Sequence, residues 1–528
     1  MKHTAIAAML LVCVSLSACA IPSVARRDPG TLVVLEAGDA NTMNPLFANN
    51  EPSFLYYGLV LDSLANVGPN FTMIPWLATS WTSTPDRLHW TVQLRHGVRW
   101  SDGAPFTSKD VVWTWHAMLD PKTGYPYAGQ FNYIKNVRAL GPYAVQFDLS
   151  HTNALFVSGA LDSPILPYHI LGKTPDAQLR TSPFGQHPIG TGPYMLERWN
   201  HDAEAIFVAN PHWWHGPVKI KRLEFRVVLD PNARDQAMEN GSADLYDSMG
   251  SNDYVTLRKQ APQLRFVHLP DLYTWFIMVN LRTPGLRNER VRQAMMYGWD
   301  RQAVISGLLH KDAIEATGIV PVALHYWYDP NVRHYAYDPA KARALLDADG
   351  WRVGRDGIRS KDGVRLDYTL LASTGSHTII DVCQEFQSDM RALGIRIHVK
   401  ELDYATFIAD SSDLHYQLAF TGWGGVTDPD EFTFFDSSQI VPIGNNETAY
   451  SNPTVDHDLQ MGLRTITPAK RRPYYNQMQA ITARQLPVLW GYYTYFRAAY
   501  VPALHIDRQA ALPDLYFWYD VWNWRLDR

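Results

Sequence analysis

The spacing of apolar residues changes along the chain, and these changes predict a mixed α and β fold. From Leu88 to Arg95 apolar and polar residues alternate, which is the period of a strand with one buried face. After the turn sequence at 101–103 the apolar period becomes 3.6. Thr107 and Asp110 have the spacing of a capping box, so we expect a helix to begin there.

The most regular pattern lies between residues 365 and 422. Strand-like runs at 365–373, 395–402 and 416–422 alternate with two helical segments, one containing Cys383 and one near 404–409. This order predicts a largely parallel sheet with right-handed crossovers. Ligands of such sheets bind beyond the carboxyl ends of the strands. The loop after the third strand, 422–432, is therefore expected to line a binding site, with its glycines leaving room for a ligand.

Helix boundaries and one cysteine are also predicted from local sequence. Asp300 is placed as an N-cap, and Asp338 opens a helix that Gly350 closes. Cys383 falls on the apolar face of its helix, which favours a buried structural thiol over a nucleophile. That face is formed by Ile379, Cys383, Phe386, Met390 and Leu393.

The first residues have the layout of an export signal. Lys2 precedes an apolar run from Ala5 to Leu16, which is too short to span a bilayer. The sequence at 16–19, ending in Cys19, resembles the bacterial lipobox. This resemblance implies a lipoprotein signal peptide at 1–18, a lipid anchor on Cys19 and a tether at 19–29. An ordinary signal with an incidental cysteine, or an N-terminal core helix, is the alternative.

Length and composition limit the remaining possibilities. The chain has 528 residues, 46% of them hydrophobic, which indicates two to four folded lobes. Its formal net charge is −5 without a basic patch, so a nucleic-acid partner is not expected. If Cys19 carries lipid, only Cys383 remains among the three cysteines once the signal is removed, and no disulfide is expected.

Motifs of catalysis are missing. The sequence contains no G-x-S-x-G elbow, HExxH pair, CxxC pair or phosphate-binding GxxxxGK loop, and no cofactor is predicted. His212 and His215 lack a third metal ligand, so no metal is predicted either. Asp428, Asp430 and Glu431 offer carboxylates to a glycan hydrolase. Asp-Pro-Asp is equally a turn sequence, and Asp430 is interpreted as a turn residue.

Several segments together resemble the extracytoplasmic solute-binding proteins of the oligopeptide and dipeptide type, which supply ABC importers. They occur in family order over nearly all of the chain after the signal. The matching segments are PWLATSW (75–81), WTVQLRHGVRWSDGAPFTSKDVVWTW (90–115), PIGTGPYML (188–196), NPHWWHG (210–216), AMENGSADL (237–245), RNERVRQAMMYGWDRQAV (287–304), YDPAKARALLDADGW (337–351) and GWGGVTDPDEF (422–432).

The resemblance implies an α/β fold of the periplasmic binding protein type (type II), with three parts, two closing lobes, a hinge and a central ligand cleft. Lobe I would comprise 30–65, 188–280 and 487–528, a small accessory lobe 66–187, and lobe II 281–486. The hinges would lie near Val279 and Pro487. It also implies a monomeric, non-enzymatic receptor outside the cytoplasmic membrane, on the periplasmic or cell-surface side, which delivers a peptide or related small polar solute to an ABC permease and its ATPase.

The expected ligand contacts follow from the same resemblance and from the aromatic residues beside the loop. They are Trp423, Gly424, Gly425, Val426, Asp428, Trp275, Tyr273 and Asn44. Val426 stands where peptide-binding members carry an Asp that pairs with the peptide α-amino group. A buried ammonium without an anion costs about 3–5 kcal/mol. Either Asp428 takes that role, or the ligand presents no buried amine. A glycan-binding or glycan-hydrolysing protein is the alternative from another class, and a related sensor or adhesin is a third.

Overall fold

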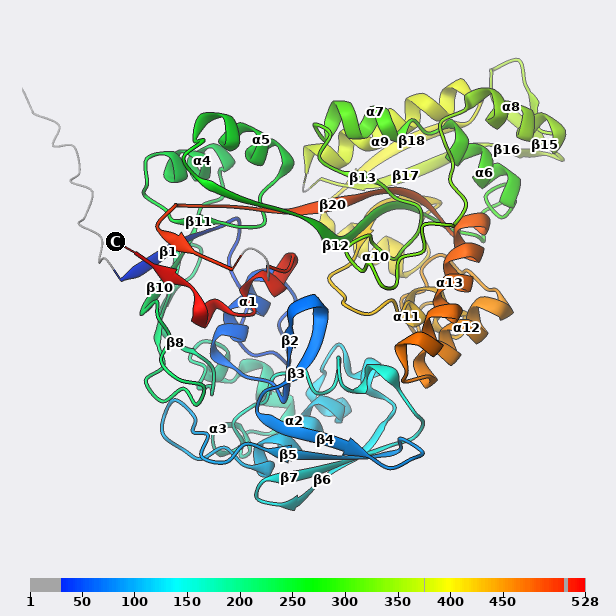
Figure 1. Cartoon of the computed structure of the whole chain (residues 1–528). Coiled ribbons are helices and arrows are strands. Elements are labelled where there is room, and N and C mark those ends of the chain that lie inside the picture. The colour runs from blue at the N-terminus through cyan, green and yellow to red at the C-terminus, as the bar shows by residue number, and fades with distance from the viewer. Residues whose placement is uncertain (1–29, 375, 508–510, 528) are drawn as a thin grey trace, which may run out of the picture.

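The computed structural model describes residues 30–374, 376–507 and 511–527, which form three lobes (Figure 1). One mixed sheet of eleven strands runs through two of them in the order β18-β17-β19-β12-β20-β11-β1-β10-β9-β8, with β13 beside β20. A separate sheet, β4-β5-β7-β6, belongs to the third. The predicted α/β, multi-lobed fold is confirmed.

Lobe I is the part of the large sheet around β1 (Thr31–Glu36), with apolar side chains on both faces. Leu32 and Val34 enter one core, and Val33 and Leu35 enter the core on the other face. A strand that is buried on both faces has a continuous run of apolar residues in its sequence, as β1 does. The other elements are α1 (Glu51–Val60), β8 (Tyr194–Asn200), β9 (Glu204–Ala209), β10 (Arg222–Val227), α4 (Pro231–Glu239), β11 (Leu245–Tyr246), α5 (Ser251–Gln260), β21 (Leu504–His505), η9 (Asp514–Trp518), η10 (Val521–Asn523) and β22 (Arg525–Leu526).

The small lobe packs α2 (Ser108–Leu119) on its own antiparallel sheet. The Thr107 side chain caps the start of α2, and the Asp110 side chain accepts a hydrogen bond from the backbone N–H of Thr107. The predicted capping box is therefore confirmed. Trp90, Trp115 and Phe147 fill its core. Its other elements include β2 (Ala65–Gly68), β3 (Thr72–Pro75), β4 (Ala78–Ser83), β5 (His89–Leu94), β6 (Ile134–Gly141), β7 (Ala144–Leu149), η4 (Ala154–Phe156) and α3 (Tyr168–Leu171).

Lobe II contains the predicted parallel strands. β17 (Asp367–Ser373) pairs in parallel with both β18 (Arg396–Leu402) and β19 (Leu418–Trp423), which confirms the strand and helix alternation. Its other elements are α6 (Glu289–Gly298), α7 (Arg301–Ala303), the π-helical turn Val304–Leu308, β13 (Ile314–Glu315), α8 (Pro339–Ala348), β14 (Arg352–Val353), β15 (Arg359–Lys361), β16 (Val364–Arg365), α9 (His377–Ala392), α10 (Tyr404–Ser412), α11 (Phe432–Phe435), α12 (Pro453–Arg464) and α13 (Pro468–Gln485).

The local predictions in lobe II also agree with the structure. Asp300 caps α7 and Asp338 caps α8 through their side chains. Cys383 is fully buried on α9, and burial raises the pKa of its thiol to about 12. The thiol is therefore structural, as predicted.

Two long antiparallel strands, β12 (Arg265–Val279) and β20 (Val488–Tyr500), connect lobe I to lobe II (Figure 1). Val267 on β12 belongs to a lobe I core, whereas Leu272 already belongs to the core of lobe II. The pairing with β20 is irregular between Pro270 and Thr274. The change of lobe thus falls inside β12, at a different place from the predicted crossing near Val279, because the strand continues unbroken into the second core.

The predicted signal peptide, Cys19 and the tether lie outside the described residues. Within the described ranges, no helix combines the length and apolarity needed to cross a membrane.

Candidate functional site

A cavity of about 470 Å³ separates the small lobe from lobe II, at the carboxyl end of β19. Trp423, Val426 and Asp430 line it from lobe II, and Tyr133 and Asn153 line it from the small lobe. The loop after β19 therefore faces an interlobe cavity, as its position after a sheet strand predicts.

Aromatic rings form one wall of this region. The Trp423 ring lies against Phe434, with 5.1 Å between ring centroids. Trp275, one strand away on β12, stacks on Phe420 at 5.5 Å. Neighbouring Tyr273 is 37% exposed. Trp423 borders the cavity directly, whereas half-buried Trp275 packs among other rings beside it.

The glycines of the loop have a different cause from the one predicted. A Cβ on Gly424 would lie 2.3 Å from the carbonyl oxygen of Leu272, so the backbone of β12 occupies that space. Gly425 has φ +78°, a left-handed conformation that favours glycine. These glycines are needed for close strand contact and for the turn, which replaces the expectation that they make room for a ligand.

Asp428 is already neutralised within the protein. Its two carboxylate oxygens accept hydrogen bonds of 2.7 and 2.8 Å from the guanidinium of Arg471 on α13. Such a bidentate pair is among the stronger polar interactions in proteins. Asp428 is therefore engaged in holding the loop to α13, and we leave it out of the proposed ligand contacts.

Asp430 is a half-buried group that lines the cavity and not only a turn residue. Desolvation, followed by the neighbouring Asp428 carboxylate, raises the pKa of Asp430 to about 8, although Arg471 opposes the shift. Its carboxyl group accepts hydrogen bonds from the Phe432 backbone and, at 3.5 Å, from the hydroxyl of Tyr475. Glu431 is buried, and desolvation raises its pKa well above the ordinary value. Sequence reasoning missed this because Asp-Pro-Asp looks the same in an exposed turn.

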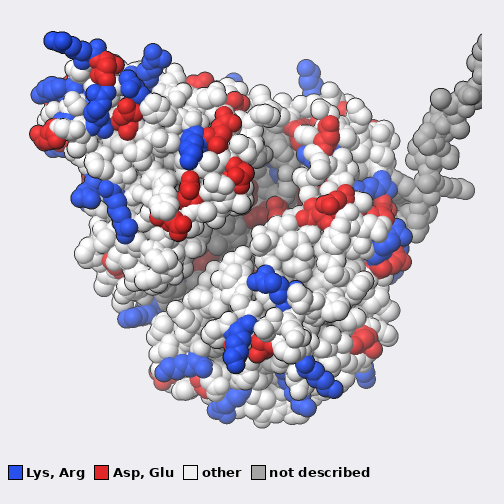
Figure 2. Space-filling model, turned by 180° about the vertical axis from the view of Figure 1, so that it is seen from behind, with Lys and Arg blue, Asp and Glu red and all other residues white. Residues whose placement is uncertain are grey.

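Negative charge approaches the loop from lobe I. Asp514 of η9 lies with one carboxylate oxygen 3.3 Å from the place of a Cβ on Gly425. Desolvation, and then the carboxylates of Asp271 and Glu51, raise the pKa of Asp514 to about 7. Figure 2 shows acidic side chains along the hollow between the lobes. The loop lacks an acid at Val426, but the carboxyl group of Asp514 from the opposite lobe lies beside it.

Asn44 is buried and does not line the interlobe cavity. It is 1% exposed, its amide nitrogen donates to the Leu179 carbonyl at 3.3 Å, and its side-chain oxygen accepts from the Leu46 amide at 3.1 Å. Its side chain orders the segment before α1, and we do not include it among the proposed contacts.

Comparison with known proteins identifies the family. Residues 72–440 match the bacterial extracellular solute-binding proteins, family 5. The chain is 27% identical to the oligopeptide-binding protein AppA of Bacillus subtilis over 471 residues, 88% of this chain and 86% of AppA. It is also 27% identical to di/tripeptide-binding protein 2 of Pseudomonas aeruginosa over 457 residues, 81% of this chain and 82% of that protein.

Comparison with solved structures leads to the same family. AppA of Bacillus subtilis in complex with a nonapeptide superimposes with a TM-score of 0.82 at 25% identity, covering 94% of this chain and 99% of AppA. NikZ of Campylobacter jejuni in complex with Ni(L-His) also gives 0.82, at 28% identity and with 94% and 100% coverage. These relatives are binding proteins, so the hydrolase alternative is set aside and the protein is not an enzyme. The chain belongs to the bacterial extracellular solute-binding proteins of family 5.

Proposed function

We propose that the protein is the lipid-anchored substrate-binding component of an ABC importer. It captures a peptide or a related small polar solute between the small lobe and lobe II and presents it to a permease and ATPase. Cys19 anchors it on the outer face of a membrane, and it acts as a monomer. The family match and the names of the peptide-binding relatives support this function.

The single observation that carries the proposal is the interlobe cavity beside Trp423. Its volume, about 470 Å³, lies within the range of small-molecule sites. Trp423 and Phe432 give it an aromatic wall, and most of its other lining side chains are polar, which suits stacking and hydrogen bonding without chemistry. We propose Trp423, Val426 and Asp430 as ligand contacts, with Gly424 and Gly425 shaping the loop and with Trp275 and Tyr273 completing the wall.

Binding would be coupled to movement of lobe II about β12 and β20. The interrupted pairing between Pro270 and Thr274 is the place where the two strands leave one core and enter the other. When domains close around a ligand, a few hinge residues usually change their backbone angles. Periplasmic binding proteins are a known example of such closure. We therefore propose this segment, together with the facing part of β20, as the hinge.

Thermal-shift measurements on the full chain without its signal test the function. The probes are di- to pentapeptides, their N-acetylated forms and oligosaccharides. A ligand at a hundredfold excess over its Kd stabilises the folded state by about 2.7 kcal/mol. Small-angle scattering on the same samples should show a smaller radius of gyration with ligand. Peptide binding with closure supports the proposal, whereas binding of oligosaccharides alone would overturn the peptide assignment.

Trp423→Ala tests whether the ligand binds beside Trp423, and Tyr337→Ala is its control. Loss of the aromatic wall should weaken binding of the active probe by about tenfold. Tyr337→Ala removes an aromatic ring that is 46% exposed and does not line the cavity, and it should leave affinity unchanged. Equal effects of the two substitutions would contradict the placement of the ligand.

A further inference from the structure

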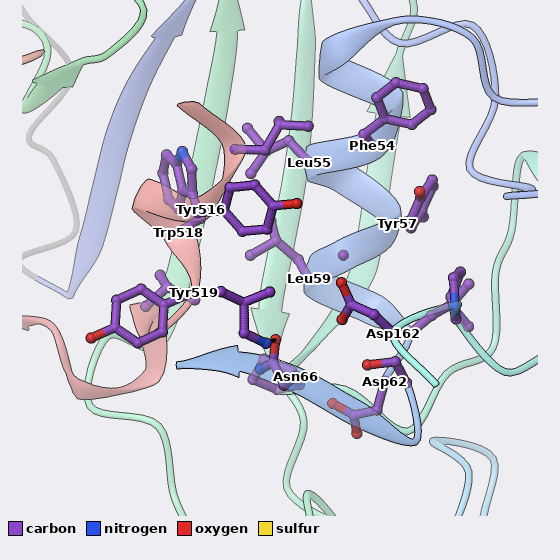
Figure 3. Close-up of a pocket in the computed structure, with 18 of the residues that line it drawn as sticks. Phe54, Leu55, Tyr57, Leu59, Asp62, Asn66, Asp162, Tyr516, Trp518 and Tyr519 are labelled. Atoms are coloured by element: carbon purple, nitrogen blue, oxygen red, sulfur yellow. Dashed lines mark hydrogen bonds between the residues drawn. The ribbon is translucent and has the colours of Figure 1, made fainter. Parts of the chain in front are cut away.

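A second cavity, about 230 Å³, lies between α1, β2 and the C-terminal segment around η9 (Figure 3). Phe54 and Tyr57 of α1 form part of its wall, and Tyr516 and Trp518 of η9 contribute from the C-terminal side. The cavity is too small for a peptide, but it has room for one side chain.

Two carboxyl groups border this cavity, and their surroundings differ. Asp62 accepts hydrogen bonds from the indole nitrogens of Trp76 at 2.7 Å and Trp214 at 2.9 Å. Asp162 has no hydrogen-bonding or ionic partner among the residues that the structure describes. Asp162 is half-buried on the cavity wall, so its carboxyl group is open to a partner supplied by a ligand.

The surroundings of Asp162 favour a positively charged guest. Desolvation raises the pKa of Asp162 well above its ordinary value, and no neighbouring donor opposes the shift. Asp162, Tyr57 and Tyr516 line the same cavity, and desolvation, with a smaller effect of the Asp162 carboxylate, raises the pKa values of both tyrosines. A cation between them would neutralise the carboxylate and lie against aromatic faces, which attract cations.

The cavity adjoins the interlobe cleft through Tyr516. This ring packs against the core of lobe II and meets Phe71 edge-on at 5.9 Å. The Thr427 side chain of the loop after β19 lies beside its hydroxyl. Asp514, two residues earlier, approaches Gly425 of the same loop. The loop that lines the interlobe cavity at Val426 therefore also lies beside the wall of this second cavity at Tyr516.

We propose that this cavity is a subsite for an organic cation of the ligand, a primary ammonium or guanidinium group, with Asp162 as its counter-ion. The proposal rests on the proposed function, because it assigns a charge to one part of the captured solute. It also supplies a counter-ion in a ligand site whose loop carries Val426 in place of an acid.

Isothermal titration with acetylated tripeptides tests the subsite. The probes are Ac-Lys-Ala-Ala, Ac-Ala-Lys-Ala and Ac-Ala-Ala-Lys, each compared with its norleucine counterpart, which has a similar length and no charge. The same norleucine peptides with a free amine show whether the α-amino group is the source of the cation. Arginine and citrulline peptides repeat the comparison for guanidinium.

We expect the wild-type protein to bind a charged probe at least about tenfold more tightly than its uncharged partner. Asp162→Asn should remove that preference while leaving the affinity for the uncharged partner. Asp362→Asn, an exposed Asp in the turn between β15 and β16, removes the same charge elsewhere and should preserve the preference.

The outcomes separate the two proposals. If uncharged peptides bind and the charged ones bind no better, the subsite is wrong and the function stands. If no probe of any charge binds, the proposed function fails as well. A further measurement does not depend on ligand. Asp162→Asn should not lower the melting temperature, because an unpaired carboxylate does not stabilise the fold, whereas a marked decrease would show a structural role.

Discussion

Arg471 and Asp428 join α13 to the loop after β19 through two hydrogen bonds, of 2.7 and 2.8 Å, within a largely buried region. The guanidinium also lies 5.2 Å from the ring centre of Trp327 and 5.1 Å from that of Tyr475. One side chain thus fixes the loop that borders the cavity, although the two partners are far apart in the sequence.

Arg471→Met should lower the free energy of unfolding by about 3–5 kcal/mol, because it leaves the Asp428 carboxylate without its counter-ion. Urea titration measures the change. Arg365→Met breaks the exposed pair with Asp356 and should cost less than about 1 kcal/mol. Similar losses for both substitutions would show that the Arg471 pair is not specially stabilising.

Gly424→Ala should destabilise the protein by about 1–3 kcal/mol, since its Cβ would overlap the Leu272 carbonyl. The melting temperature reports the change. Gly307→Ala is the control, because a Cβ there meets nothing within 4 Å. That substitution should leave stability unchanged or raise it by up to about 1 kcal/mol. A neutral Gly424→Ala would mean that β12 and the loop separate easily.

Stability should fall as pH rises from about 4 to about 8 through the contribution of Asp430. Its folded pKa, about 8, is higher than the ordinary 3.8, so between these values the folded state holds a proton that the unfolded state releases. Asp430→Asn should reduce the fall, measured as melting temperature at pH 5 and pH 8. The fall will not vanish, because the pKa values of Asp247 and Asp514 are also raised, to about 7. An unchanged slope would contradict the desolvation of Asp430 at the cavity wall.

Val426→Asp should introduce a preference for free-amine peptides over their N-acetylated forms, by about tenfold or more. Val426 is 39% exposed at the cavity, so a carboxylate there reaches a ligand. Calorimetry with matched peptide pairs measures the ratio. Val426→Asn has a similar size without the charge and should produce no such preference; if it does, hydrogen bonding and not charge is responsible.

Cys19→Ser should release the protein from membranes, because it removes the proposed site of lipid attachment. Detergent phase partitioning of the wild-type and variant proteins shows the difference. Cys13→Ser changes a cysteine within the apolar run and should leave partitioning unchanged. Aqueous partitioning of the wild-type protein would reject the lipid anchor.

Features set by neighbouring residues were predictable from the sequence. The capping box of Thr107 and Asp110 spans one helical turn, and the buried position of Cys383 follows from the 3.6 period of its own helix. The parallel order of β17, β18 and β19 follows from strands alternating with helices. In each case the relevant residues are close in the chain, or the topology is restricted by chirality.

Features that depend on distant partners were not predictable. Nothing near Asp428 indicates that Arg471 will meet it, and nothing near Asp162 indicates that its surroundings will include Tyr57 and Tyr516. The change of core within β12 was not predicted from the sequence, because β12 is one strand from Arg265 to Val279 and its apolar residues serve both lobes. Placing the candidate site therefore required the tertiary structure.

The three lobes have separate cores, and the cavity walls are drawn from more than one of them. A substitution on one wall leaves the packing of the other lobes intact. Evolution can therefore alter ligand preference one wall at a time without rebuilding the scaffold. A single ancestral architecture can in this way diversify toward cargoes as unlike as the nonapeptide of AppA and the nickel–histidine complex of NikZ.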